Sequence, residues 1–345
     1  MQRRTFISAS LGLGLLGGAA MPWLRAASAG SDSPGRSSPL QMFTGAGLAF
    51  GTTVSVKLMH DDEKVAARAI EDALNQIKGI DRLMSLYRPD SQVSVLNRQG
   101  YLDRPDARLV AVLRQTQELA RLTEGAFDIT VQPLWSAYST AAARGEQPTS
   151  AQIDAATRTV GWRKLSIDSQ AVRFAQPDMA VTLNGIAQGY ATDLALAAIK
   201  KHGIRHALLD AGEFAALGKP APQRPWTLGV RNPRDNARLA ATLPLEGRSM
   251  ATSGDYEMRF AADFSSHHIV DPATGRSPLE LASVSVLAPS GMLADGLSTA
   301  CFVMGTKKAL ALCEAMPGVD ALLIAKSGQT WRTAALSGIS GAVPA

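Results

Sequence analysis

An aspartate and a threonine that share one face of a predicted helix are the residues of this chain best suited to bind a metal ion. Asp295 and Thr299 lie in Ala294–Ala300, after a turn in which Ser290 is a suitable helix N-cap. Residues four apart point the same way on a helix, and Ser298 lies close to that face. A carboxylate and a hydroxyl are hard oxygen ligands that suit Mg²⁺, whose other positions go to water, a carbonyl and phosphate oxygens. Taken alone, the spacing is more typical of a solvated or capped helical pair than of a metal site.

A second candidate is the segment Val181–Asp193, where a predicted strand runs into a glycine-containing turn and then a helix. Gly185 and Gly189 would let the backbone approach a ligand closely, and free amides at a helix start favour phosphate. The spacing is neither a P-loop nor GxGxxG. The segment therefore predicts either a phosphate-contacting turn or a tight packing turn.

Two adjacent histidines, His267 and His268, precede the predicted turn Asp271–Gly275. Neutral imidazole accepts protons near pH 7, so His268 is a candidate general base. The alternative is a histidine that orders the turn through Asp271. A histidine metal site is disfavoured, because neither a His-x3-His pair nor a nearby cysteine accompanies the two residues.

Tyr87 and Phe127 are candidates for lining a flat aromatic-binding pocket, although such rings more often belong to the core or its rim. Asp128 stands in an otherwise apolar run. A buried carboxylate at that position needs partners.

Helices and many short strands must position these residues. Apolar residues at helical spacing predict helices over 62–84, 105–123, 186–202 and 291–303. The alternating run 52–58 predicts a strand. Further short strands are predicted at 163–167, 171–174, 179–183, 206–209, 226–231, 239–243, 266–270, 282–288 and 319–325. This order, without strict βαβ alternation, predicts an α+β fold with mixed or antiparallel sheets packed against helices.

Charge and cysteine content exclude some functions. Charged residues make up 19% and hydrophobic residues 46% of the 345 residues, which is typical of a globular protein. Three arginines of residues 1–29 account for three of the five net positive charges, so a nucleic-acid partner is not expected. Cys301 and Cys313 each lie in an apolar run and are predicted to be buried, with a disulfide or a metal role as the alternatives.

The N-terminus predicts export. Arg3 and Arg4 precede an apolar stretch that is short for a membrane span, and a small-residue cleavage site follows at Ala29. Residues 1–29 are therefore predicted to be a twin-arginine signal peptide that directs the protein to the periplasm. A general secretory leader and an uncleaved anchor are the alternatives. Residues 30–41 have the composition of a flexible linker, which leaves 42–345 as one catalytic domain.

The set of motifs, in its order, resembles the ApbE-type family, the FAD:protein FMN transferases. The resemblance runs from about residue 45 to 330. The matching segments are Phe50–Thr53, Met84–Asn97, Gly125–Pro133, Leu183–Asp193, Ala251–Tyr256, His268–Gly275 and Ala294–Thr299.

The resemblance implies a single α+β domain that binds FAD in a cleft between its sheets. It implies that Asp295, Thr299 and the carbonyl of Gly185 bind Mg²⁺. Asp295 and the candidate general base His268 are the predicted catalytic residues. The residues implied to contact FAD are Tyr87, Ala126, Phe127, Asp128, Thr182, Gln188, Ile269 and Ser298.

Four positions depart from the family pattern. The usual Asp-Leu-Gly-Gly is Thr182-Leu183-Asn184-Gly185 here, the usual lysine is Gln188, and Phe50 replaces a common methionine. The variant segment is similar to that of the NosX-like subgroup, which serves nitrous oxide respiration and whose client is a membrane flavoprotein regulator. The missing acid at Thr182 puts the flavin or adenine contact at that position in doubt.

The function that the resemblance implies is Mg²⁺-dependent transfer of FMN from FAD to a threonine or serine hydroxyl of a client envelope flavoprotein, with release of AMP. Mg²⁺ would neutralise charge on the diphosphate as its bond breaks. Two alternatives remain. One is an FAD pyrophosphatase that uses water, and the other is a non-catalytic FAD-binding assembly factor.

Overall fold

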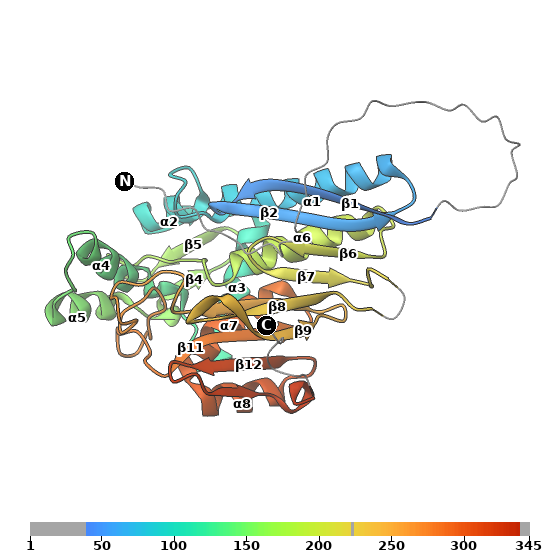
Figure 1. Ribbon diagram of the computed structural model, residues 1–345. Coiled ribbons are helices and arrows are strands. Elements are labelled where there is room, and N and C mark those ends of the chain that lie inside the picture. Colours follow the sequence, from blue (N-terminus) through green and yellow to red (C-terminus); the bar gives the residue numbers. More distant parts are fainter. Residues whose placement is uncertain (1–38, 222–223, 339–345) are drawn as a thin grey trace, which may run out of the picture.

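An eight-stranded antiparallel sheet forms the centre of the molecule, with the strand order β1-β2-β6-β7-β10-β11-β12-β13 (Figure 1). The computed structural model describes residues 39–221 and 224–338. The predicted signal peptide and the predicted linker up to residue 38 lie outside the described residues. The strands of this sheet are β1 (Gln41–Ala49), β2 (Thr52–His60), β6 (Ala207–Asp210), β7 (Phe214–Leu217), β10 (Ser249–Gly254), β11 (Leu281–Ala288), β12 (Asp320–Ala325) and β13 (Thr330–Arg332).

The first hairpin shows why the sheet begins where it does. The predicted strand 52–58 is confirmed, since Val54, Val56 and Leu58 alternate inward and are fully buried. Phe50 and Gly51 both have positive φ, which suits a two-residue hairpin turn. The predicted linker boundary at residue 41 is wrong by one residue, because Gln41 already pairs with His60 in β1.

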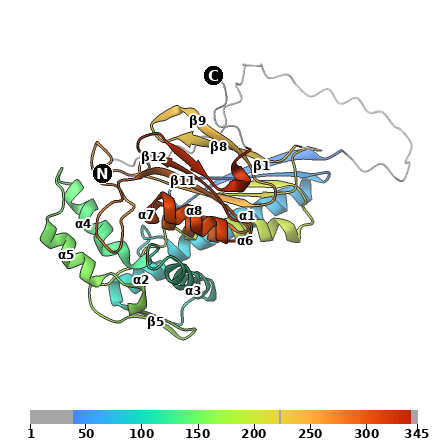
Figure 2. The same cartoon turned by 90° about the horizontal axis from the view of Figure 1, so that it is seen from below.

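Helices cover one face of the sheet and a β-hairpin covers the other (Figure 2). The helices are α1 (Glu63–Met84), α6 (Ala187–Lys201), α7 (Gly291–Met304) and α8 (Thr306–Ala315). The hairpin consists of β8 (Thr227–Asn232) and β9 (Asp235–Pro244), and a separate apolar cluster joins it to the sheet. In β12, Ala321 and Leu323 belong to the core on the helical side, whereas Leu322 and Ile324 belong to the hairpin side.

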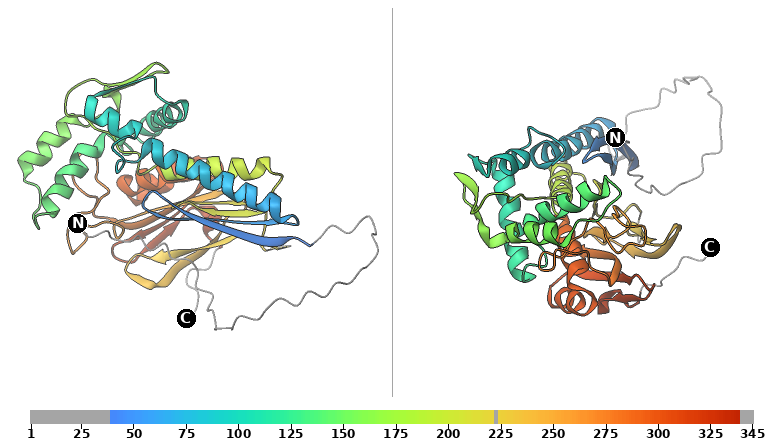
Figure 3. Two further views of the ribbon diagram at one scale, coloured as in Figure 1. Left: turned by 90° about the horizontal axis from the view of Figure 1, so that it is seen from above. Right: turned by 90° about the vertical axis from the view of Figure 1, so that its left-hand side faces the viewer.

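A helical region extends from one end of the sheet (Figure 3). It contains α2 (Gln92–Gln99), α3 (Ala107–Leu122), α4 (Gln132–Ala142) and α5 (Ser150–Thr159). A small sheet with the order β3-β5-β4 completes it, formed by Tyr101–Asp103, Ala171–Phe174 and Leu165–Ile167. Three 3-10 turns lie at Ile129–Val131, Trp162–Lys164 and Ala334–Leu336. Among the described residues, no helix is both long enough and apolar enough to cross a membrane.

Two predicted strands are wrong. Residues 179–183 and 266–270 are irregular, because the backbone groups of the first bond to distant segments and those of the second bond within their own loop rather than to a ladder. Val181 exchanges two hydrogen bonds with the side chain of Asn97, and Thr182 N–H donates to the carbonyl of Ile129. His267 forms only an isolated bridge with Arg259. The apolar residues of both segments, among them Val181, Ile269 and Val270, are buried, and buried apolar residues in a short run resemble a strand pattern in the sequence.

The four predicted helices are confirmed with small shifts at their ends, and the α+β class is confirmed with sheets that are antiparallel throughout. Cys301 and Cys313 are buried free thiols, as predicted. Their sulfur atoms lie 3.7 Å apart.

Helices α6 and α7 cross at two glycines. A Cβ added to Gly189 would overlap the carbonyl oxygen of Gly291 and lie 2.7 Å from Cβ of Asp295. A Cβ added to Gly291 would lie 2.5 Å from the carbonyl oxygen of Gly189. The two backbones therefore approach closely because neither residue has a side chain.

We expect Gly189→Ala to lower the free energy of unfolding by about 1–3 kcal/mol, because α6 and α7 must separate to admit the methyl group. Urea unfolding followed by circular dichroism measures this change. Gly79→Ala is the control, since Gly79 lies inside α1 and an added Cβ there meets only the Arg108 side chain at 3.5 Å. The control should be neutral or stabilising by up to about 1 kcal/mol. Equal losses in both variants would contradict the close-contact explanation.

Candidate functional site

The carboxylate of Asp295 is buried at the crossing of α6 and α7. The residue is 3% exposed, and its Oδ2 accepts a hydrogen bond of 3.0 Å from the backbone N–H of Gly189. Burial raises the pKa of Asp295 to about 7, and the nearby carboxylate of Asp193 acts in the same direction. No side-chain cation pairs with Asp295 among the ion pairs of the described residues.

Asp193 makes the reciprocal contact from α6 to α7. Its two carboxylate oxygens accept from the backbone N–H groups of Gly291 and Met292, at 2.6 and 2.9 Å. Ser290 is the N-cap of α7 as predicted and accepts from Leu293 N–H at 3.3 Å. These acceptors satisfy three of the four unpaired amides at the start of α7. Asp295 and Thr299 are therefore fixed by caps on the first turn of their own helix.

Thr299 lies one turn beyond Asp295 and next to Gly185. A Cβ added to Gly185 would lie 2.9 Å from Oγ1 of Thr299 and 3.6 Å from the ring of Phe127. The hydroxyl of Thr299 also lies 3.1 Å from that of Ser253, a residue of β10. The structure thus places Gly185 next to Thr299, one helical turn from Asp295, and these are the three residues that the family resemblance implied as one group.

The oxygens of this group fit a hard divalent cation. They are the carboxylate of Asp295, which has no cationic partner among the described residues, and the hydroxyl of Thr299. Gly185 lies next to this hydroxyl and has no side chain to fill the space. Within 39–221 and 224–338, no cluster of three histidine, cysteine, aspartate or glutamate side chains suitable for a metal is present. A cation here would therefore take several oxygens from water or from a bound phosphate.

Glu213 is an acid near this group that the sequence analysis missed. Its Oε2 accepts from Thr252 N–H at 3.3 Å, and burial followed by the charge of Asp295 raises the pKa of Glu213 well above its usual range. Gln188 contacts the same turn, since its side-chain amide donates to the carbonyl of Ala211 at 3.2 Å. Glu213 has no recognisable signal in the sequence, because it lies in a short turn between β6 and β7.

The two adjacent histidines have different environments. His267 is fully buried, its Nε2 lies 3.1 Å from the carbonyl of Pro278, and burial lowers its pKa to about 4. His268 is partly buried, and its Nδ1 lies 3.1 Å from the carbonyl of Met258. A carbonyl only accepts, so Nδ1 of His268 carries the proton and Nε2 keeps a free electron pair. Burial also lowers the pKa of His268, which favours the neutral ring.

The alternative role for His268, ordering the turn through Asp271, does not occur. The carboxylate of Asp271 instead accepts from Ala273 N–H at 2.9 Å and from the Thr274 hydroxyl at 3.0 Å. A histidine that is neutral and protonated on Nδ1 has the form that a general base requires.

The loop that carries His268 is anchored to the β8–β9 turn by an ion pair. Arg234 donates two hydrogen bonds of 2.7 Å to the fully buried carboxylate of Asp255, and its guanidinium stacks on Phe264 at 4.1 Å. Lys326 donates to the carbonyl of Phe264 at 2.5 Å. At the other end of the loop, the hydroxyl of Tyr138 donates to the carbonyl of Gly275 at 3.0 Å. The loop is thus held from both sides.

The predicted flavin-contacting residues differ in exposure. Tyr87 is 71% exposed and its ring is available for stacking. Phe127 is buried next to Gly185, and Ile269 is buried in the core. Ala126 is partly exposed in the turn before Phe127, and Thr182 is partly exposed in the segment that Asn97 holds.

Asp128 has its predicted partners within the fold. Its carboxylate accepts from Thr130 N–H at 2.8 Å, from the Thr130 hydroxyl at 2.6 Å and from Trp162 N–H at 2.9 Å. These bonds account for its burial. The contact of Asp128 with flavin stays a prediction.

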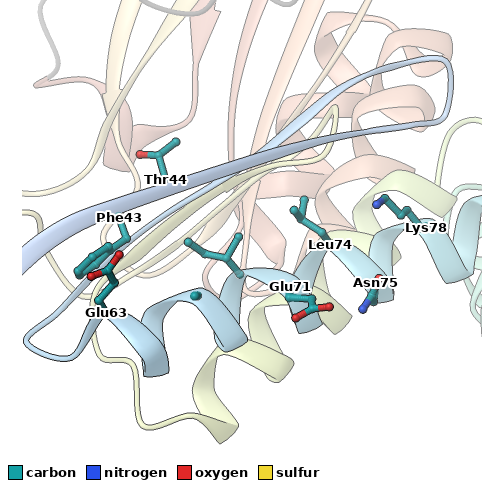
Figure 4. A pocket seen from close by; sticks show the side chains of 9 residues that line it. Phe43, Thr44, Glu63, Glu71, Leu74, Asn75 and Lys78 are labelled. Carbon is teal, nitrogen blue, oxygen red and sulfur yellow. The ribbon is translucent and has the colours of Figure 1, made fainter. Parts of the chain in front are cut away.

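A pocket of about 420 Å³ lies between α1 and the edge strand β1, as Figure 4 shows. Charged or amide side chains of α1 line it, including Glu63, Glu71 and Lys78, together with Phe43 from the strand. None of the residues predicted to bind metal or flavin lines this pocket. We therefore do not assign the chemistry to it.

Comparisons with known proteins point to one family. The sequence profile of the ApbE family matches residues 50–323. An FAD:protein FMN transferase of Haemophilus influenzae is 32% identical over 286 residues, which cover 78% of this chain and 82% of the relative. Another, from Salmonella typhimurium, is 33% identical over 301 residues, which cover 83% of this chain and 85% of that relative. The apo form of the flavinyl transferase ApbE of Pseudomonas stutzeri superposes with a TM-score of 0.76 at 30% identity, covering 88% and 98% of the two chains.

The raised pKa of Asp295 predicts how stability depends on pH when metal is removed. The unfolded carboxyl titrates near 3.8 and the folded one near 7. Between these values the native state binds the extra proton, so the contribution of Asp295 to stability is complete below about pH 4 and is lost as pH rises to about 7.

Asp295→Asn keeps an oxygen for Gly189 N–H and removes the buried charge. In EDTA we expect this variant to melt several degrees above the wild type at pH 8, because each kcal/mol gained in the free energy of unfolding raises the melting temperature by about 2–4 °C. The difference should shrink toward pH 5. Differential scanning fluorimetry across pH measures it, and a wild type that melts above the variant at pH 8 would contradict the pKa assignment.

Proposed function

The chain belongs to the ApbE family and is an enzyme that transfers FMN from FAD to a protein, and from this premise we propose its chemistry. The reaction is Mg²⁺-dependent, the acceptor is a threonine or serine hydroxyl of an exported flavoprotein, and the other product is AMP. The observation that carries the proposal is the convergence of Asp295, Thr299 and Gly185 at the crossing of α6 and α7.

Asp295, Thr299 and the carbonyl of Gly185 are the residues that would hold the cation. A bound magnesium ion supplies positive charge to the diphosphate oxygens as charge develops on them. The protein supplies the rigidity. Asp193 and Ser290 cap α7, and the contact between Gly189 and Gly291 fixes the distance between the helices. The donor oxygens therefore do not have to reorganise when the substrate binds.

The bond changes are those of a phosphoryl-group transfer. The client hydroxyl oxygen forms a bond to the phosphorus on the FMN side of FAD, and the bond from that phosphorus to the oxygen of AMP breaks. His268 accepts the hydroxyl proton on Nε2. Its Nδ1–H is held by the carbonyl of Met258, which fixes the ring in the required tautomer.

The flavin would be held by the segments that surround this point. Tyr87 offers an exposed ring for stacking, and Phe127 lies against Gly185. Gln188 replaces a lysine of the family pattern, and its amide is already bound to Ala211. Recognition of the phosphates therefore depends on backbone amides and on the cation more than on a side-chain charge at this position.

We further propose that the protein acts in the periplasm. The paired arginines Arg3 and Arg4 and the small-residue site at Ala29 support export by the twin-arginine route. The segment Leu183–Gly189 supports assignment to the NosX-like subgroup, so a membrane flavoprotein regulator of nitrous oxide reduction is the first client to test.

The direct test is incubation of the purified protein with FAD, Mg²⁺ and the candidate client. We expect a fluorescent client band with a mass increase of one FMN and release of AMP. Free FMN without a labelled client would favour the pyrophosphatase, and intact bound FAD would favour a non-catalytic binding protein.

Asp295→Ala and Asp295→Asn should both abolish transfer, because the cation loses its only side-chain anion. Thr299→Val should weaken the Mg²⁺ dependence less, since one neutral ligand is lost. In-gel flavin fluorescence at increasing Mg²⁺ concentrations measures both effects. Full activity of Asp295→Asn would refute the metal assignment, because that variant retains the hydrogen bond to Gly189.

His268→Ala should slow transfer by roughly 10²–10⁴-fold, the usual loss for a general base, while FAD affinity stays close to that of the wild type. Flavin fluorescence quenching without Mg²⁺ measures the affinity. His202→Ala is the matched control, since His202 pairs with Asp72 beyond the last turn of α6. Loss of FAD binding in His268→Ala would show that the residue holds substrate instead.

A further inference from the structure

Three hydroxyl groups form a chain between β10 and α7. The Oγ of Ser253 lies 2.8 Å from the Oγ of Ser298 and 3.1 Å from the Oγ1 of Thr299. Ser298 in turn donates to the backbone carbonyl of Asp295 at 2.9 Å. Ser253 belongs to the segment Ala251–Tyr256, to which neither the sequence analysis nor the proposed function gives a role.

The direction of this chain follows from counting protons. Each hydroxyl has one proton to donate and two electron pairs that accept. The carbonyl of Asp295 only accepts, so the proton of Ser298 is committed to it. Ser298 must then accept from Ser253, which uses the proton of Ser253. Ser253 must therefore accept from Thr299, and the proton of Thr299 points toward β10.

This order determines what Thr299 presents to its surroundings. Because the hydroxyl of Thr299 donates its hydrogen bond to Ser253, its electron pairs are available on the side where Gly185 lies. An oxygen binds a cation through an electron pair, and a proton aimed at the cation would repel it. Thr299 is partly exposed, whereas Ser298 is 1% exposed. The one hydroxyl of the pair on α7 that is open to a ligand is thus the one turned for coordination.

We propose that Ser253 is a positioning residue that orients the hydroxyl of Thr299 for a divalent cation. This inference rests on the metal site of the proposed function. It also restricts Ser298, which the resemblance placed in contact with FAD. Because the hydroxyl of Ser298 donates its hydrogen bond to the backbone carbonyl of Asp295, it cannot donate to a phosphate oxygen and can only accept a hydrogen bond.

Without Ser253, the proton of Thr299 loses its acceptor. A threonine in a helix then commonly donates to the carbonyl four residues earlier, which here belongs to Asp295. That rotation would turn the proton away from β10 and change the direction of the electron pairs. The expected loss of binding free energy is about that of one hydrogen bond, which corresponds to an affinity for the cation about five- to tenfold weaker.

The test is Ser253→Ala in the complete chain, with Mg²⁺ affinity measured by isothermal titration calorimetry and repeated with Mn²⁺ by electron paramagnetic resonance of the free ion. We expect a five- to tenfold weaker affinity and the same shift in the Mg²⁺ concentration for half-maximal transfer. The maximal rate at saturating Mg²⁺ should stay close to that of the wild type. Ser253→Thr, which restores a hydroxyl, should recover most of the affinity.

Ser285→Ala is the matched control. Ser285 is fully buried in β11, and its hydroxyl lies 2.8 Å from that of Thr252, the neighbour of Ser253 on β10. Its removal deletes an equivalent bond between hydroxyl groups without touching Thr299, so it should lower the melting temperature without changing Mg²⁺ affinity. A Ser253→Ala variant that loses only thermal stability would show that Ser253 is merely structural.

The outcomes separate this inference from the proposed function. If Thr299→Val and Asp295→Asn bind Mg²⁺ more weakly but Ser253→Ala binds it as the wild type does, the positioning role is refuted and the metal site stands. If none of the three variants changes Mg²⁺ affinity, the metal site itself is refuted, and the role of Ser253 with it.

Discussion

The exchange of carboxylates between α6 and α7 determines the geometry of the whole site. Asp193 on α6 caps the start of α7, while Asp295 on α7 accepts from the first turn of α6. The two glycines at the crossing allow this exchange, because each carboxylate reaches the other helix only when the backbones are close. A carboxylate bound to amide groups at a helix start is stabilised by the helix dipole.

This arrangement has an energetic cost that the proposed chemistry explains. Asp295 is buried, no ion pair of the described residues gives it a cationic partner, and burial raises its pKa. Glu213 adds a second acid whose pKa is raised by burial and by Asp295. A protein that needed Asp295 only to cap α6 would meet the same need with a neutral side chain. Retention of the charge is consistent with a divalent cation that binds in the working enzyme.

The sequence predicted the elements of the site better than their surroundings. The N-cap Ser290, the helix after it and the shared face of Asp295 and Thr299 depend on local spacing, and all three are confirmed. The predictions of strands at 179–183 and 266–270 were wrong because apolar residues buried in an irregular segment, such as Val181 and Ile269, resemble those of a short strand. The choice between His267 and His268 also depends on distant groups, since it is set by the carbonyls of Pro278 and Met258.

The roles of Ser253 and Glu213 were beyond the reach of sequence patterns for the same reason. Neither residue lies at a regular sequence spacing from Asp295 or Thr299. Ser253 lies near them because β10 pairs with its neighbouring strands, and Glu213 because of the turn after β6. Residues of this kind are ordinary strand or turn residues in the sequence. Their chemistry is visible only when hydrogen-bond directions are followed from atom to atom.

The contacts that assemble the centre join segments far apart along the chain. Gly189 and Asp295 are 106 positions apart, and Asp193 and Gly291 are 98 apart. A chain that ends before residue 291 contains the aromatic residues predicted to hold flavin but lacks Asp295 and Thr299, the side chains proposed to bind the cation. The proposed centre can therefore form only once α7 has been made.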